Sequence, residues 1–167
     1  MRDPIPPHLA EQVRQAEREL ARRLRKTDVL RFLGIRLVAA EPGRVVLSFR
    51  ARAHHLQAHR VVHGGVMATL ADTAGGLATY MSIPPGTRVA TVEMKINFLE
   101  AVEKGTVTAE ARVIRCGRNF SVVDCDVRDE ADRLVSKALM TFAIGPAATP
   151  APAPQSARPG KSRRVRS

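Results

Sequence analysis

The sequence predicts an α+β domain in which a strongly curved antiparallel sheet wraps around one central helix, with an extra helix at the N-terminus. Two observations support this prediction. The stretch from Val61 to Thr87 holds one formal charge in 27 residues, at Asp72, and small apolar residues dominate it from Gly64 to Ser82. Two strand-like segments precede this stretch and four follow it, joined by short turns. Such elements bury their apolar faces in a single core.

The region before the central helix is expected to hold one helix and two strands. The segment from His8 to Lys26 predicts a solvated helix, because apolar residues recur at helical spacing among Arg and Glu: Leu9, Val13, Leu20 and Leu24. Residues 29–40 are strand-like only toward their end. After the turn at Glu41-Pro42-Gly43, the segment from Arg44 to Phe49 alternates as a second strand with one apolar face: Val45, Leu47 and Phe49.

Four strands are expected after the central helix. The clearest has one apolar face, formed by Val92, Met94, Ile96 and Phe98, and the alternation places Thr91 on the other face, beside Glu93 and Lys95. Two further alternating segments follow, at 107–113 and 123–127, and then a last strand at 134–144 with both faces partly apolar. Small side chains on the helix let this sheet approach closely: Ala68, Ala71, Ala74, Gly75 and Ala78.

Composition divides the chain into a helical extension at 1–28, a core domain at 29–145 and a Pro/Ala-rich tail at 146–167. The tail carries five Lys/Arg and no Asp/Glu, nearly half of the net charge of +11, and is expected to be disordered. A basic tail can contact nucleic acid or anionic lipid. A solvated tail without a partner is the favoured interpretation, and the lack of Trp argues against a nucleic-acid platform.

The sequence predicts a cytoplasmic protein with no membrane partner. No secretory signal is visible at the polar N-terminus. The uncharged helix is interrupted by Asp72 and Gly75-Gly76 and ends at Pro84-Pro85, so it does not resemble a membrane span. The two cysteines, Cys116 and Cys125, have no metal-ligand spacing and are expected to be reduced.

Asp72 and the glycines at the helix start are the candidate catalytic groups. A lone carboxylate in an apolar helix loses solvation unless it is paired or has a chemical role. The free backbone N–H groups at His63-Gly64-Gly65 form a site for negative charge. An activated carboxylate and an oxyanion-binding helix start are two parts of a hydrolytic site. The alternative is a structural Asp72 whose carboxylate is satisfied by a neighbouring hydroxyl, such as that of Thr69 or Thr73.

The order of elements, with His63-Gly64-Gly65 followed by Leu70-Ala71-Asp72-Thr73-Ala74, resembles the hotdog-fold acyl-CoA thioesterases. The similarity is greatest to the PaaI-type (phenylacetate-pathway) branch of the 4-hydroxybenzoyl-CoA thioesterase superfamily. It covers residues 30–145 and extends to the Thr91–Leu99 strand and the Gly117-Arg118 turn. The resemblance implies hydrolysis of an acyl-coenzyme A thioester without a cofactor, at the interface of a homodimer that often pairs into a homotetramer.

The resemblance also assigns roles to single residues. The backbone N–H of Gly64 or Gly65 polarises the thioester carbonyl and holds the oxyanion. Asp72 acts as nucleophile or as general base toward water. His63 either lies near the site or caps the helix. Gln57 stands where the PaaI branch usually has Asn, and its longer amide is expected to orient the thioester or the attacking water.

Further residues are assigned more loosely. Thr91 matches a Ser/Thr position that holds the water in some family members. Arg115, Arg118 and Lys137 are candidates for binding the phosphates of coenzyme A, because cations on turns and strand ends suit a flexible diphosphate, although each is also an ordinary surface charge. No metal site is predicted from the neighbouring histidines, because their segment reads as a loop: His54, His55, His59 and His63.

The spacing of the catalytic groups predicts a dimer. Asp72 lies eight residues beyond Gly64, so about 12 Å separates them along one helix. That distance is too great for both to act on one carbonyl carbon. A carboxylate from one subunit that meets the helix start of its neighbour resolves the problem.

The sequence therefore predicts an acyl-CoA thioesterase for a medium-chain or aromatic acyl group. The alternative is a non-catalytic, acyl-CoA-binding regulatory module of the same fold. Such regulators carry a separate helix-turn-helix unit, for which residues 1–28 are too short. A hotdog dehydratase would need a catalytic His within an Asp/His helix motif that the sequence lacks.

Overall fold

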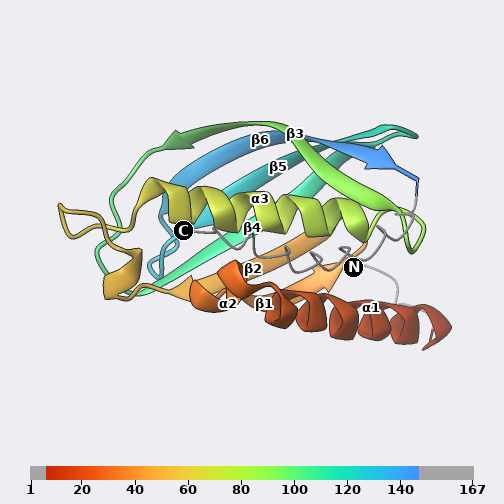
Figure 1. Cartoon of the computed structure of the whole chain (residues 1–167), viewed down its shortest axis with the longest axis horizontal. Coiled ribbons are helices and arrows are strands. Elements are labelled where there is room, and N and C mark those ends of the chain that lie inside the picture. The colour runs from red at the N-terminus through yellow and green to blue at the C-terminus, as the bar shows by residue number, and fades with distance from the viewer. Residues whose placement is uncertain (1–6, 147–167) are drawn as a thin grey trace, which may run out of the picture.

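A computed structural model describes residues 7–146 (Figure 1). The elements follow in this order: α1 (Pro7–Lys26), α2 (Asp28–Phe32), β1 (Arg36–Glu41), β2 (Arg44–Arg50), the 3-10 helix η1 (Ala53–His55), α3 (Gly64–Tyr80), β3 (Arg88–Phe98), β4 (Thr106–Cys116), β5 (Phe120–Arg128) and β6 (Leu134–Gly145). Within the described range, no helix is both long and apolar enough to cross a membrane. The predicted tail at 146–167 lies outside the described residues, apart from Pro146.

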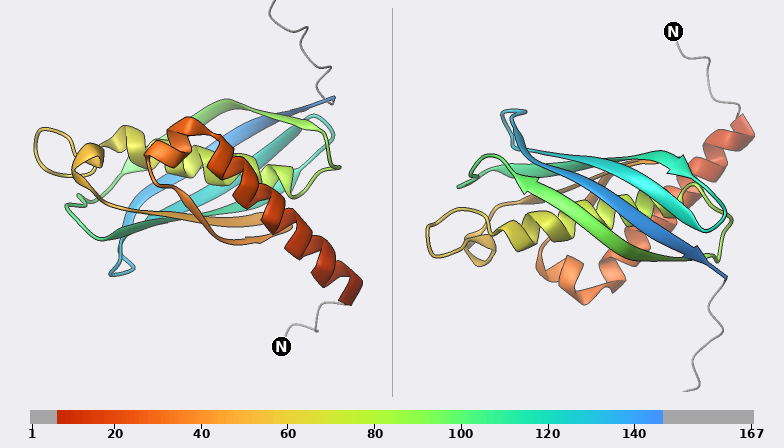
Figure 2. Two further views of the ribbon diagram at one scale, coloured as in Figure 1. Left: turned by 60° about the horizontal axis from the view of Figure 1, so that its bottom comes forward. Right: turned by 90° about the horizontal axis from the view of Figure 1, so that it is seen from above.

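One six-stranded antiparallel sheet curves around α3 (Figures 1 and 2). Its strand order is β1-β2-β4-β5-β6-β3. The inward side chains of the strands and one face of the helix form a single core, in which these strand residues are fully buried: Val45, Leu47, Val107, Ala109, Ala111, Val123, Cys125 and Val127. The predicted hotdog architecture is confirmed.

Small residues on α3 allow the close approach that the sequence predicts. Ala71, Ala74 and Ala78 are fully buried. A Cβ atom at Gly75 would lie 2.7 Å from Cε of Met140 and 2.9 Å from the nearest ring atom of Phe142. Both contacts are closer than van der Waals separation, so any side chain at Gly75 would force Met140 and Phe142 of β6 to shift.

The N-terminal helix joins the core at its C-terminal end. Leu20 and Leu24 of α1 are buried in one cluster with residues that follow them: Leu30, Leu33 and Ile35. Figure 2 shows α1 on the outside of the domain, where it packs against β1 and α2. The helix α2 was not predicted from the sequence, because five residues are too few to show a helical period.

Strand β3 departs from the predicted alternation at Val92. The pairing with β6 shifts register between Thr91 and Glu93, so Val92 is the extra residue of a β-bulge. A bulge reverses the facing of the residues on one side of it. Thr91 consequently lies on the inner face, and its predicted place beside Glu93 and Lys95 is wrong. Val92, predicted to face the core, is 55% exposed.

The strands β1 and β3 form the two edges of the sheet. β3 is 11 residues long and pairs with β6 on one side. Its other side has no strand partner among residues 7–146. An edge strand of this length, with exposed Val92, Phe98 and Leu99 on it or next to it, presents backbone groups that a second chain can pair with.

Candidate active site

The entrance of α3 is formed by the triplet His63-Gly64-Gly65. His63 is the N-cap, with an extended backbone (φ −64°, ψ 133°), and its Nδ1 accepts a hydrogen bond from the Gly65 N–H at 2.9 Å. This contact supports the capping role of His63. It also occupies the Gly65 N–H. The Gly64 N–H forms no hydrogen bond within the described part of the chain, so it is available to a ligand where the Gly65 N–H is not.

A tightly bonded loop holds Gln57 beside this helix start. The Gln57 N–H donates to the carbonyl of Val61 at 2.8 Å, and the Gln57 carbonyl accepts from the N–H of Arg60 at 2.9 Å. Gln57 and Gly64 line the same cavity of about 370 Å³, which the ring of Phe98 also lines. We call Gln57 and Gly64 the glycine half-site.

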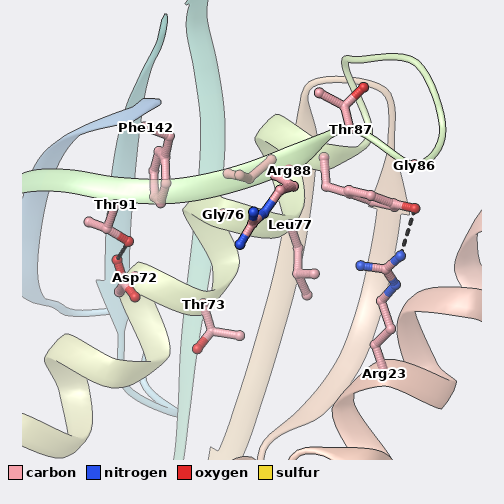
Figure 3. Close-up of a pocket in the computed structure, with 12 residues that line it drawn as sticks. Arg23, Asp72, Thr73, Gly76, Leu77, Gly86, Thr87, Arg88, Thr91 and Phe142 are labelled. Carbon is pink, nitrogen blue, oxygen red and sulfur yellow. Dashed lines mark hydrogen bonds between the residues drawn. The ribbon is translucent and has the colours of Figure 1, made fainter. Parts of the chain in front are cut away.

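Asp72 projects from the middle of α3 toward β3 (Figure 3). Its Oδ1 accepts a hydrogen bond of 2.7 Å from the Thr91 hydroxyl. The hydroxyls of Thr69 and Thr73 instead donate to backbone carbonyls of the helix, at 2.8 and 2.7 Å, so the interpretation in which either satisfies Asp72 is wrong. Asp72 is half-buried in the protomer, less than the sequence suggested. We call Asp72 and Thr91 the aspartate half-site.

A cavity of about 510 Å³ opens beside the aspartate half-site and is lined from α1, α3 and β3. Arg23 lies at one end of it (Figure 3). Its guanidinium donates to the hydroxyl of Tyr80 at 2.8 Å and lies 4.2 Å from the centre of the Tyr80 ring. Figure 3 shows the Arg88 side chain between Asp72 and Arg23, over the Gly76 and Leu77 turn of α3. The cavity is therefore lined by one carboxylate, that of Asp72, and by the cationic side chains of Arg23 and Arg88.

The two half-sites line different cavities of one protomer. Gly64 begins α3, and Gln57 lies in the loop beside it. Asp72 lies two turns further along the helix, where Thr91 of β3 contacts it. The spacing of about 12 Å that the sequence indicates applies, because one continuous helix carries both Gly64 and Asp72. One protomer does not bring a carboxylate and the free helix N–H to the same reacting carbon.

The three residues expected to bind phosphate differ in their surroundings. The Lys137 ammonium donates to Asp124 and Asp126, both at 2.6 Å. Partial burial acts to lower the pKa of Lys137, but the two carboxylates outweigh it and the pKa is raised. Lys137 therefore stays charged, but the charges of Asp124 and Asp126 balance it. An ammonium group already paired in this way does not fit a role in phosphate binding. Arg115 and Arg118 are exposed around the β4–β5 turn and form no ion pair within residues 7–146.

The neighbouring histidines do not converge on one point. The rings of His54 and His55 pack edge to face, while His63 caps α3. Burial, followed by the charges of His54 and Arg52, lowers the pKa of His55 and favours its neutral form. In the described part of the chain, no three His, Cys, Asp or Glu side chains are grouped to hold a metal ion.

Comparison with known proteins identifies the family. The model of the Thioesterase superfamily matches residues 59–136, which include α3 and β3. The 1,4-dihydroxy-2-naphthoyl-CoA hydrolase of Listeria monocytogenes is 30% identical over 112 residues, which cover 67% of this chain and 91% of that protein. The chain belongs to the thioesterase superfamily.

Solved structures of hotdog thioesterases are similar throughout the core domain. A thioesterase from Haemophilus influenzae superposes with a TM-score of 0.72 at 30% identity, over 77% of this chain and 89% of that one. The PaaI protein from the phenylacetic acid degradation operon of E. coli superposes with a TM-score of 0.70 at 27% identity, over 84% and 96%. The resemblance inferred from the sequence is confirmed.

Three cavity residues escaped sequence reasoning: Arg23, Tyr80 and Arg88. The first lies in the N-terminal helix, far from the motif in sequence, and its contact with Tyr80 depends on how α1 packs. Tyr80 is the only tyrosine of the chain and ends the helix that carries Asp72. Its place at the end of that helix was the one feature of the sequence that could have suggested Tyr80 as a site residue.

Proposed function

We propose that this protein hydrolyses the thioester of an acyl-CoA with a medium-chain or aromatic acyl group, giving the free acid and coenzyme A. The observation that carries the proposal is the separation of two complementary half-sites on one helix. The aspartate half-site supplies a carboxylate held by Thr91. The glycine half-site supplies a free N–H at a helix start. Together they are the parts that thioester hydrolysis needs.

The complete site is proposed to form between two subunits. Thr91 contacts Asp72, and seven residues further along β3 the ring of Phe98 packs on Gly64, within 3.0 to 3.3 Å of an ideal Cβ at that position. An antiparallel two-fold pairing of two β3 edges reverses one strand against the other. It therefore sets the Thr91 end of one subunit against the Phe98 end of its partner, which supports a homodimer with two shared sites. Such dimers are proposed to pair further into a homotetramer.

In this site the Gly64 N–H and the helix dipole stabilise the oxyanion that develops on the thioester carbonyl. Asp72 then acts by one of two routes. As nucleophile, its carboxylate oxygen bonds to the carbonyl carbon, the C–S bond breaks and the coenzyme A thiolate leaves, after which water hydrolyses the anhydride. As general base, it takes a proton from the water that attacks the carbon, after which the C–S bond breaks and the coenzyme A thiolate leaves.

The other site residues are given positioning roles. The Thr91 hydroxyl fixes Oδ1 of Asp72 and leaves Oδ2 for the water or the thioester. The Gln57 amide orients the thioester from the glycine half-site. His63 holds the helix start in place through Gly65. Arg115 and Arg118 are proposed to contact the phosphates of the substrate.

A thiol-release assay over a panel of acyl-CoAs tests the function. We expect Asp72→Asn to lower kcat by about 10²- to 10⁴-fold, the usual contribution of a positioned acid or base. Asp132→Asn is the matched control, because it makes the same acid-to-amide change on an exposed turn. Thiol release that Asp72→Asn leaves unchanged contradicts the mechanism. Acyl-CoA binding by the wild type without turnover would instead favour the regulatory module.

A further inference from the structure

A second cavity, of about 430 Å³, lies between α2, η1 and the strands β1 and β2. This position is at the β1 side of the sheet, whereas the proposed dimer uses the β3 edge. Cationic and imidazole side chains dominate its lining, and none of its described lining residues is acidic: Arg31, Arg36, Arg50, Arg52, His54 and His55. The cavity is thus separate from both half-sites and strongly positive.

Three of these four arginines have no carboxylate partner. Arg31 pairs with Asp28 at 2.7 Å. The other three, Arg36, Arg50 and Arg52, form no ion pair within residues 7–146. Like charges gathered at one cavity repel each other, and an anion bound among them relieves that repulsion.

The sheet register brings two of these cations together. Arg36 of β1 pairs with Ser48 of β2, and Arg50 lies two residues beyond Ser48 on the same face. The side chains of Arg36 and Arg50 therefore project from adjacent strands on one side of the sheet. Diagonal neighbours of this kind have backbone positions about 7–8 Å apart. The carboxylate of Glu130 accepts a hydrogen bond of 3.3 Å from the N–H of Thr106, which also lines the cavity.

A row of four rings forms the other wall. Phe32 and His54 lie 5.0 Å apart between ring centres, His54 and His55 4.1 Å, and His55 and Phe49 4.8 Å. The inner half of the row is fixed, because His55 and Phe49 are each 1% exposed and Nδ1 of His55 accepts from the Arg52 N–H at 3.0 Å. The outer end is open, since Phe32 is 66% exposed. The buried ring of His55 thus supports the exposed ring of Phe32, which lies beside the arginines.

The two walls favour ligands that carry both a phosphate and a planar ring. Guanidinium groups match the oxygens of phosphate with paired hydrogen bonds. An exposed aromatic ring supplies a stacking surface for a nucleobase. Neither wall alone would distinguish a nucleotide from a simple anion or an apolar ligand, but a nucleotide has the groups for both.

We propose that this cavity binds the phosphorylated end of a nucleotide, with its phosphate on Arg36, Arg50 and Arg52 and its base against Phe32 and His54. The nucleotide end of coenzyme A and a free nucleotide present the same groups. If coenzyme A is the source, the inference rests on the proposed thioesterase function and places its phosphates here instead of on Arg115 and Arg118, which lie at the other end of β4. If a free nucleotide is the source, the cavity is a site independent of hydrolysis.

Calorimetric titration of the full chain with adenosine 3′,5′-bisphosphate tests the site without turnover. We expect binding that weakens with added salt. The double variant Arg36→Gln/Arg50→Gln should bind roughly tenfold or more weakly, the effect of losing one or two charge-assisted hydrogen bonds. Arg25→Gln is the matched control, because Arg25 is also exposed and without an ion pair within residues 7–146.

A second variant tests the aromatic wall. Phe32→Leu should weaken binding of the bisphosphate and leave binding of inorganic phosphate unchanged. No binding by the wild type, or equal weakening by the double variant and by Arg25→Gln, would overturn the proposal, because the latter reports only general attraction to a cationic chain. Equal melting temperatures for all variants confirm that each is folded.

Kinetics then distinguish the two sources. With coenzyme A as the source, the double variant raises KM for an acyl-CoA but not for the acyl-pantetheine that lacks the nucleotide. With a free nucleotide as the source, binding of the bisphosphate falls while both KM values stay as in the wild type. Because calorimetry needs no thiol release, a failure of the thioesterase proposal would leave the binding result intact and recognisable.

Discussion

Replacing Gly64 by proline should remove the oxyanion donor and leave α3 formed. Gly64 is the first residue of the helix, a position that tolerates proline because its N–H has no partner inside the helix. The preceding residue, His63, already has the extended backbone (ψ 133°) that proline requires of its predecessor. The Gly64 N–H makes no hydrogen bond within residues 7–146, so the substitution deletes the donor and little else.

The expected loss follows from the role of that donor. One oxyanion donor contributes about 10²–10³ in kcat, or about 2.7–4 kcal/mol. A side chain at this position also meets the Phe98 ring, since a Cβ at Gly64 would lie 3.0 Å from it. Phe98 is 51% exposed and has room to shift. Gly64→Ala adds the same Cβ and keeps the N–H, so it measures the contact with Phe98 alone.

The assay is thiol release at saturating acyl-CoA, with the melting temperature of each variant measured alongside. We expect Gly64→Ala to retain most of the wild-type kcat and Gly64→Pro to lose at least two orders of magnitude. Equal losses in the two variants would refute the reasoning, because the Phe98 contact would then explain both. Full activity of Gly64→Pro would also refute it, since the donor would have to be another group, such as the Gly65 N–H released by His63.

The same variant tests the shared site by complementation. In a heterodimer of Gly64→Pro and Asp72→Asn chains, one site combines both defects and the other combines two intact halves. Random reassociation of equal amounts makes half of the dimers mixed, so the mixture should recover about a quarter of the wild-type activity from two inactive proteins. A site built within one chain predicts no recovery.

The remaining predictions concern the aspartate half-site and the core. Thr91→Val should lower kcat about tenfold, because it removes the 2.7 Å hydrogen bond to Asp72, and Thr91→Ser should restore it; a loss that serine does not rescue would contradict the positioning role. Gly75→Ala should destabilise the fold by about 1–3 kcal/mol in chemical denaturation, since its Cβ would lie 2.7 Å from Met140. Gly76→Ala, with its nearest contact at 3.5 Å, should instead gain about 0.5–1 kcal/mol from helix propensity, and equal effects at the two positions would disprove the packing argument.

The fold, the helix start at Gly64 and the place of Asp72 on the same helix could be predicted because local sequence determines them. A helix start is fixed by its own glycines and cap, and Asp72 stands out because 26 uncharged residues surround it. The position of Gly64 and Asp72 on one helix follows from helical rise alone. Strand alternation likewise gives the inward residues of β2, β4 and β5 without knowledge of their partners.

The features that sequence could not give depend on pairing between distant segments. The bulge at Val92 is a mismatch between β3 and β6, and neither strand alone encodes it in a recognisable pattern. Lys137 looked like a free cation, but the register of β5 against β6 sets Asp126 directly opposite it. Arg23 reaches Tyr80 because α1 packs on β1, which brings its C-terminal half near the end of α3.

The bulge explains how one strand serves both the fold and the aspartate half-site. Met94 and Ile96 keep the regular alternation that packs β3 on α3. Without an extra residue, the same alternation would turn Thr91 away from the helix and leave Asp72 without its hydrogen-bond donor. Val92 takes up that extra position on the exposed edge, so the inner face gains Thr91 without losing Met94. The orientation of the carboxylate is therefore set by the strand edge at which the second subunit is proposed to bind, which couples subunit pairing directly to the geometry of the aspartate half-site.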